Sequence, residues 1–198
     1  MRPHEQMSLL EERRLADGAI GGDADAVRAL WHAHRRWIAA ILLAHKPREA
    51  ELDDLLQEVA VLITRNIATL NDPAAVKPWL RTIAINVARS TGRRQRVAGK
   101  ALPVLAGSAR RTAERQEREE VGDDSGRRAL DLASALPPEY REPLLLRAVR
   151  GLSYRQIADV MGVPMTTIET RLARARRMLK EQLDALEAPK AGADRSSS

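Results

Sequence analysis

Apolar residues recur at intervals of three and four along most of the chain, a spacing that predicts α-helices. In the N-terminal half it predicts one helix beginning after Asp23, a second over residues 51–70 and a third over residues 77–94. The apolar stripes of the first two are Val27, Leu30, Trp31, His34, Ile38 and Ile41, then Leu55, Val59, Leu62, Ile63, Ile67 and Leu70. The chain lacks runs in which Val, Ile, Thr or Tyr alternate with polar residues, so we expect an all-α fold.

The third predicted helix has two chemically different faces. Its apolar side carries Leu80, Ile83, Ala84, Val87 and Thr91, and its opposite side carries Thr82, Asn86, Arg89 and Arg93. The segment from Arg81 to Lys100 contains bases and no acid. Solvated faces normally mix both signs of charge, so a purely basic face favours a nucleic-acid backbone as its partner.

The second predicted helix is acidic where the third is basic. Asp54, Gln57 and Glu58 lie together on the side opposite its apolar stripe, and residues 49–58 contain no base. This charge asymmetry indicates two different partners. Asn71, Asp72 and Pro73 break the chain in a short loop between the two helices.

The C-terminal half carries the pattern of a helix-turn-helix. Ser153 is placed to cap a short first helix, Ala158 allows close helix packing, and Gly162 supplies the turn. A longer helix then opens at Pro164, with Ile168, Leu172, Ala175 and Leu179 facing inward. Its outward and flanking side chains are Thr166, Thr167, Thr170, Arg171, Arg174 and Arg177. Hydroxyls and guanidiniums at the start of such a helix suit phosphates and base edges in a major groove.

Between these halves the apolar periodicity is lost. We therefore expect two small helical domains over residues 8–96 and 129–186, a flexible linker over 97–128 and a disordered tail over 187–198.

Composition narrows the possible functions. The chain has 198 residues, a net charge of +6, a pI near 10.3 and no cysteine, which excludes disulfides, thiol nucleophiles and cysteine-based metal sites. His32 and His34 point in different directions on one helix, and no catalytic motif is found, so we expect no metal, no cofactor and no enzymatic activity. The sequence has neither an N-terminal apolar targeting segment nor a stretch long enough to span a membrane, and we expect a cytoplasmic protein.

Three strings in this order resemble the extracytoplasmic-function (ECF) sigma factors, small members of the sigma-70 family. They are DLLQEVAVLI at residues 54–63, WLRTIAINVARSTGRRQR at 79–96 and the segment from Leu136 to Leu179 that contains the helix-turn-helix. The resemblance covers roughly residues 10–186 and implies a region 2 domain, a linker and a region 4 domain. It departs from the family pattern at Glu169, where a basic residue is often found, and in the first helix, where Val27, Trp31 and His34 replace common aromatics.

The resemblance implies partners and residue roles. Core RNA polymerase would be bound through the clamp helices of its beta-prime subunit and through its beta flap, with Asp54, Gln57 and Glu58 meeting the clamp helices. The minus-10 promoter element would be contacted by Asn71, Asp72, Thr82, Asn86, Arg89, Arg93, Arg94 and Arg96. The minus-35 element would be contacted by Thr166, Thr167, Glu169, Thr170, Arg171, Arg174 and Arg177. Many family members also have an anti-sigma factor, which makes such an inhibitor a candidate partner.

One alternative stays open at this point. A stand-alone transcription regulator can carry the same type of helix-turn-helix and bind promoter DNA without polymerase. Such regulators usually need a ligand or phosphoacceptor domain or a dimer interface, and the N-terminal half has no acidic pocket at a strand end.

Overall fold

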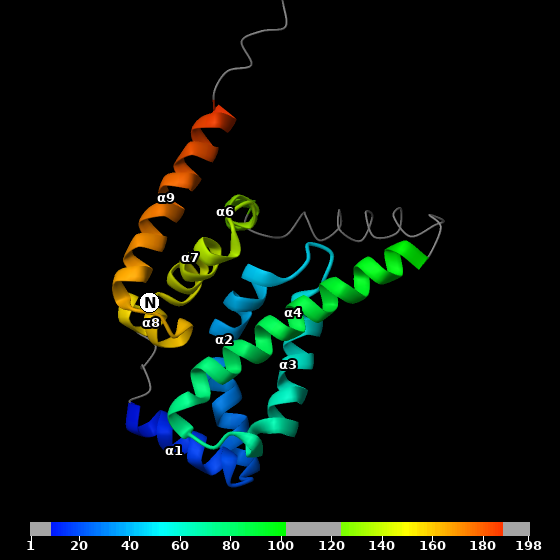
Figure 1. The fold of residues 1–198 in the computed structure, drawn as a ribbon, viewed down its shortest axis with the longest axis vertical. Coiled ribbons are helices and arrows are strands. Elements are labelled where there is room, and N and C mark those ends of the chain that lie inside the picture. Colours follow the sequence, from blue (N-terminus) through cyan, green and yellow to red (C-terminus); the bar gives the residue numbers. More distant parts are fainter. Residues whose placement is uncertain (1–8, 102–123, 188–198) are drawn as a thin grey trace, which may run out of the picture.

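The computed structural model describes residues 9–101 and 124–187, and every regular element within these ranges is a helix (Figure 1). The all-α prediction is therefore confirmed. Most of the predicted linker and nearly all of the predicted tail lie outside the described residues. No helix in the described ranges is long and apolar enough to cross a membrane.

Over residues 9–101, the described part of the N-terminal half, the structure has four α-helices and two short 3-10 turns. The helices are α1 (Leu9–Ile20), α2 (Ala24–His45), α3 (Leu52–Asn66) and α4 (Val76–Ala101), and the turns are Ile67–Thr69 and Pro73–Ala75. Asp23 caps α2 as predicted, because its side chain accepts a hydrogen bond from the backbone N–H of Asp25 at 2.9 Å. Helix α1 was not predicted; its buried apolar positions include Ala16 and Ala19, whose small side chains give a weak periodic signal.

Helix α2 lies at the centre and contacts α1, α3, α4 and α7. Its predicted stripe is buried at Leu30, His34, Ile38 and Ile41, while Val27 and Trp31 are half-buried. Trp37 and Leu42 are also buried, although the predicted stripe omits them. The C-terminal part of α2 is thus covered on more than one side.

Helix α4 differs from its prediction in length and in burial. It begins at Val76 and continues past Arg94 to Ala101. The predicted apolar side is buried at Leu80, Ala84 and Val87, but Ile85 and Ala88 are buried as well. Because Arg81, Ile85 and Ala88 follow one another at intervals of four and three, they form a second covered stripe on α4.

The C-terminal half contains α6 (Asp124–Ser134), α7 (Pro138–Arg150), α8 (Tyr154–Met161) and α9 (Met165–Glu187). The sequence pattern placed the start of this domain at residue 129, but α6 begins earlier, at Asp124. In α7, Leu145 and Leu146 are buried, whereas Val149 near the C-terminal end is 39% exposed.

The two halves pack against each other, which the sequence did not predict. Helix α7 lies beside α2 (Figure 1), and α8 contacts α4. One continuous apolar core therefore includes residues of both halves.

Candidate nucleic-acid and protein interfaces

The predicted polymerase-contact residues lie on the outer face of α3. Asp54 and Gln57 are exposed, and the side chain of Glu58 is 34% exposed. Glu58 accepts a hydrogen bond from Nη2 of Arg94 on α4 at 2.8 Å. The structure thus pairs a residue of the predicted polymerase-contact set with one of the predicted minus-10 set.

The predicted minus-10 residues of α4 form an exposed stripe. Thr82, Asn86, Arg89 and Arg93 are all exposed on the side away from Leu80, Ala84 and Val87. Arg96 is also exposed, on the same helix. The exposed guanidiniums of Arg89, Arg93 and Arg96 can therefore contact a phosphate backbone, in addition to the paired Arg94.

The loop before α4 is positioned by its own side chains. Asp72 accepts a hydrogen bond from the backbone N–H of Ala74 at 2.9 Å and so caps the short turn Pro73–Ala75. Asn71 and Asp72 are both exposed. Trp79 is half-buried and packs against the core, in agreement with a packing role at the start of the helix.

The helix-turn-helix has the local geometry that its sequence predicts. Ser153 and Gln156 form a reciprocal capping box at the start of α8. Gly162 ends α8 in the left-handed conformation, with φ of +65°, and the backbone N–H of Val163 donates to the carbonyl of Ala158 at 3.2 Å. These contacts fix the angle at which α9 leaves the turn.

Helix α9 presents the predicted minus-35 residues on its outer side. Ile168, Leu172 and Ala175 are buried. The exposed members of the predicted set are Thr166, Glu169, Thr170, Arg174 and Arg177, and the half-buried members are Thr167 and Arg171. The guanidinium of Arg174 lies 5.7 Å from the ring centre of Tyr140, a cation–π contact that restricts its position. Arg177 Nε lies 3.7 Å from a carboxylate oxygen of Glu181, one turn further along α9.

Sequence reasoning missed a second basic group beside this helix. Arg176 donates a hydrogen bond to the hydroxyl of Tyr154 at 2.7 Å, and the guanidinium of Arg147 lies 5.8 Å from the ring centre of Tyr154. Both arginines are exposed. The signal in the sequence was Tyr154, one of only two tyrosines in the protein, because a tyrosine ring and hydroxyl are common partners of arginine side chains.

A buried polar cluster joins α1, α2 and the start of α4. Trp37 Nε1 donates to Nδ1 of His34 at 2.9 Å, and Nε2 of His34 lies 3.3 Å from Glu12 Oε1. Glu12 also pairs with Lys77 at 2.5 Å. Burial, with the nearby charges of Lys77 and Arg150, lowers the pKa of His34 to about 3, so this imidazole is neutral at pH 7.

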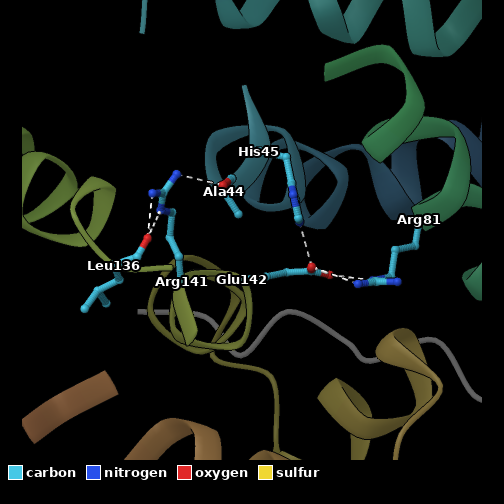
Figure 2. A network of polar contacts seen from close by, with 6 residues as sticks. All are labelled: Ala44, His45, Arg81, Leu136, Arg141 and Glu142. Atoms are coloured by element: carbon cyan, nitrogen blue, oxygen red, sulfur yellow. Dashed lines mark hydrogen bonds and ion pairs between the residues drawn. The ribbon is translucent and has the colours of Figure 1, made fainter. Parts of the chain in front are cut away.

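A second polar network links the two halves, and Figure 2 shows its central carboxylate between two partners. Glu142 on α7 is 1% exposed. It accepts hydrogen bonds from Arg81 Nε at 2.5 Å and Arg81 Nη2 at 2.9 Å, and its Oε2 lies 2.8 Å from His45 Nε2. Burial by itself would raise the pKa of Glu142, but the hydrogen bonds from His45 and Arg81 outweigh it and lower that pKa. The carboxylate is therefore ionised at neutral pH and held by both N-terminal partners.

Among the residues that the structure describes, no three His, Cys, Asp or Glu side chains come together as a group that could hold a metal ion.

Comparison with known proteins matches both halves in the order of the sequence. The family model "Sigma-70 region 2" matches residues 30–97, and "Sigma-70, region 4" matches residues 127–179. The chain is 28% identical over 185 residues to the ECF RNA polymerase sigma-E factor of Haemophilus influenzae, covering 89% of this chain and 97% of that protein.

Two solved structures are similar to the fold. CnrH in complex with the cytosolic domain of CnrY matches with a TM-score of 0.59 and 25% identity, over 88% of this chain and 97% of CnrH. The sigma factor RpoE from Bartonella quintana, in complex with the anti-sigma factor NepR, matches with a TM-score of 0.51 and 22% identity, over 84% of this chain and 98% of RpoE.

Proposed function

The chain belongs to the sigma-70 family as an ECF sigma factor that acts in transcription initiation with core RNA polymerase and promoter DNA, and from this premise we propose how its residues divide the task. The region 2 domain, over residues 8–96, binds the polymerase and the minus-10 element. The region 4 domain, over residues 129–186, binds the minus-35 element. The chemistry of RNA synthesis stays with the polymerase.

The polymerase contact is made by the acidic face of α3. Asp54, Gln57 and Glu58 supply carboxylates and an amide on one exposed surface, which suits a basic partner such as the beta-prime clamp helices. The beta flap is the proposed second contact, with the region 4 domain.

The minus-10 contact is made by the exposed stripe of α4 and the loop before it. Polar Thr82 and Asn86 are placed to contact unstacked bases, and Arg89 and Arg93 to hold the backbone, as expected for a single-stranded target. Asn71 and Asp72 border the same surface along the chain, with Arg94 and Arg96 continuing the basic stripe.

The minus-35 contact is made by α9 in a major groove. Thr166, Thr170 and Arg174 present hydroxyls and a guanidinium on the exposed side near its N-terminus, and Arg174 is pre-positioned by Tyr140. Thr167, Glu169, Arg171 and Arg177 complete this surface. Glu169 is an acidic residue among these basic and hydroxyl side chains, and it is proposed to alter the base preference at the minus-35 element.

An anti-sigma factor is a proposed further partner, and the cytoplasm is the proposed site of action because the polymerase works there. The support is the fold similarity to RpoE, whose solved structure contains its anti-sigma factor NepR.

The observation that carries this proposal is that two exposed basic helix faces, on α4 and α9, lie within the two matched sigma-70 regions. The test is transcription by purified core polymerase with and without this chain, together with duplex DNA binding by the chain alone. We expect specific initiation only in the joint reaction. Tight, sequence-specific binding without polymerase and no initiation would contradict the proposed roles of Asp54, Gln57 and Glu58.

A further inference from the structure

Helix α9 carries a single carboxylate among the side chains proposed to face the minus-35 element. Glu169 is the only acidic residue between positions 165 and 180. The basic residues of the same segment are Arg171, Arg174, Arg176, Arg177 and Lys180. Glu169 is exposed, and so are Thr166 and Thr170 beside it. A negative group on a surface suited to phosphates opposes DNA binding, because like charges repel.

The helix itself does not neutralise this carboxylate. A carboxylate on a helix can pair with a basic residue three or four positions away. For Glu169 these four positions hold no basic residue; they are Met165, Thr166, Leu172 and Ala173. Within the described residues, no hydrogen bond or ion pair holds the Glu169 carboxylate. In the free protein its hydrogen bonds therefore come from water.

The helix dipole does not account for Glu169 either. Acidic side chains are favoured at a helix N-terminus, but this effect falls off within the first turn. Helix α9 begins at Met165, so Glu169 is its fifth residue and lies in the second turn. The carboxylate thus adds little to the stability of α9, and its position on the exposed face favours a role in binding.

The side chains next to Glu169 offer few hydrogen-bond donors. Thr170 Oγ1 donates to the backbone carbonyl of Thr166 at 2.9 Å, so its hydroxyl proton is already used. Met165 is 47% exposed and Ala173 is exposed, but neither side chain has a donor. When α9 enters a major groove and water leaves, the DNA must supply the donor that the carboxylate loses.

The major groove offers such a donor on only two bases, at N4 of cytosine and N6 of adenine. Adenine also presents its N7 acceptor beside N6, and this acceptor repels a carboxylate. Guanine presents O6 and N7, and thymine presents O4, so both place acceptors against the carboxylate. Cytosine is therefore the base that best compensates a carboxylate for its lost water.

We propose that Glu169 contacts a cytosine in the minus-35 element, accepting a hydrogen bond from its N4 amino group. The same negative charge repels the acceptors of other bases, so one side chain supplies both attraction and exclusion at this position. Arg174 is five residues further along α9 and rotated by about 140° around the helix axis, and it contacts a separate base pair. This inference rests on the proposed function, which requires α9 to bind the minus-35 duplex, and it adds the identity of one base.

The first test measures base preference at each minus-35 position. Holoenzyme assembled from core polymerase and the full chain binds promoter DNA with a randomised minus-35 element, and the bound DNA is sequenced. The wild type should favour cytosine at one position by about 5- to 150-fold. Glu169→Gln should shift that position towards adenine, since an amide pairs with N6 and N7 of adenine. Glu169→Ala should lose the preference and bind the other sequences more tightly than the wild type.

Asp184→Asn is the matched control on the same helix. It also removes one carboxylate from an exposed position, about 22 Å further along α9 at roughly 1.5 Å per residue. It should leave every base preference unchanged. Circular dichroism on each variant checks that the helices remain.

The second test removes the donor from the DNA. Pyrimidin-2-one in place of the selected cytosine lacks the N4 amino group and should weaken binding by the wild type. In Glu169→Ala the same replacement should have a smaller effect, because the acceptor is already absent and the two losses are then not additive. Additive losses would show that Glu169 does not contact N4 and would overturn the inference.

The outcome for Arg174 separates this inference from the proposed function. Identical base preferences in the wild type, Glu169→Gln and Glu169→Ala would overturn the role of Glu169. If Arg174→Ala still changes the preference at another minus-35 position, the proposed contact of α9 stands and only the role of Glu169 fails. If no variant changes any position, the proposed minus-35 contact of α9 fails as well.

Discussion

Arg94 on α4 donates a hydrogen bond from Nη2 to Oε1 of Glu58 on α3 at 2.8 Å. The two side chains are 65% and 34% exposed, so water screens the pair and its contribution to stability is small. The proposed polymerase surface and the proposed minus-10 surface therefore meet at one ion pair. Either partner can leave the pair for a stronger contact at low energetic cost.

Glu58→Gln separates binding from folding. We expect the affinity for core polymerase to fall, because a carboxylate facing a basic partner is lost, while the free energy of unfolding changes by less than about 1 kcal/mol. Affinity is measured with labelled protein and purified core enzyme, and stability by urea unfolding. Glu49→Gln is the control, an exposed acid outside the proposed contact set. A loss of stability with unchanged affinity would show that Glu58 serves the fold instead.

Arg93→Ala tests the basic stripe of α4. Arg93 is exposed, so its removal should weaken promoter binding by the holoenzyme on all sequences alike. The slope of log affinity against log salt should become shallower by about 0.7 for one lost contact to single-stranded phosphate. Arg35→Ala, an exposed base on α2, should leave the slope as it is. An unchanged slope in Arg93→Ala would exclude this phosphate contact.

Arg174→Ala tests sequence discrimination by α9. With its guanidinium held over the Tyr140 ring, Arg174 is expected to contact a base edge. Its loss should reduce discrimination at one minus-35 position by about 1–3 kcal/mol and leave binding to sequences that lack the preferred base nearly unchanged. Competition binding of the holoenzyme to promoters altered one base at a time measures this. Equal losses on every promoter would identify Arg174 as a phosphate contact.

The helices that bear the proposed site could be predicted from the sequence because their buried faces repeat with the helical period. The stripes of α2 and α3 came from apolar spacing, the polar face of α4 from the polar and basic residues opposite such a stripe, and the cap at Ser153 from a serine at the start of a helical pattern. The reciprocal hydrogen bond from Gln156 was found only in the structure. Helix α1 gave only a weak signal of this kind, since its buried face is made partly of alanines.

The domain interface could not be predicted in the same way. The partners of Glu142 are 61 and 97 residues away in sequence, and no local pattern encodes such pairs. One signal was present: Glu142 lies three and four positions before Leu145 and Leu146, which places a charge on the apolar face of α7. A charge on a buried face implies a partner but does not identify it.

His34 should make stability depend on pH. Glu12 at 3.3 Å would favour the protonated ring, but Glu12 already pairs with Lys77, and burial dominates, so the pKa of His34 is lowered to about 3. In the unfolded chain His34 has its ordinary pKa near 6.5, so between about pH 6.5 and 3 the unfolded chain binds more protons than the folded one. Stability is therefore complete above about pH 6.5 and falls as the pH drops towards 3, by up to about 1.4 kcal/mol per pH unit.

Urea unfolding of the wild type and His34→Gln between pH 7 and 5 tests this, above the range in which carboxyl groups usually titrate. Gln retains an acceptor for Trp37 and cannot become charged, so the variant should lose less stability over this interval. His32→Gln, on the exposed side of α2, should keep the wild-type dependence. Parallel curves for the wild type and His34→Gln would show that the buried imidazole is not the titrating group.

Substitution of alanine for glycine should lower the stability of the protein at Gly162 and raise it at Gly92. Gly162 ends α8 with φ of +65° and has open space around an added methyl group, so Gly162→Ala meets only backbone strain and should destabilise the protein by about 1 kcal/mol. Gly92 lies inside α4, where an added Cβ would meet Pro47 Cγ at 3.6 Å, an ordinary contact. Gly92→Ala should therefore stabilise by about 0.5–1 kcal/mol through helix propensity. Urea unfolding of both variants measures this difference, and a destabilised Gly92→Ala would mean that α4 and the segment at Pro47 are packed more tightly than their contact distance indicates.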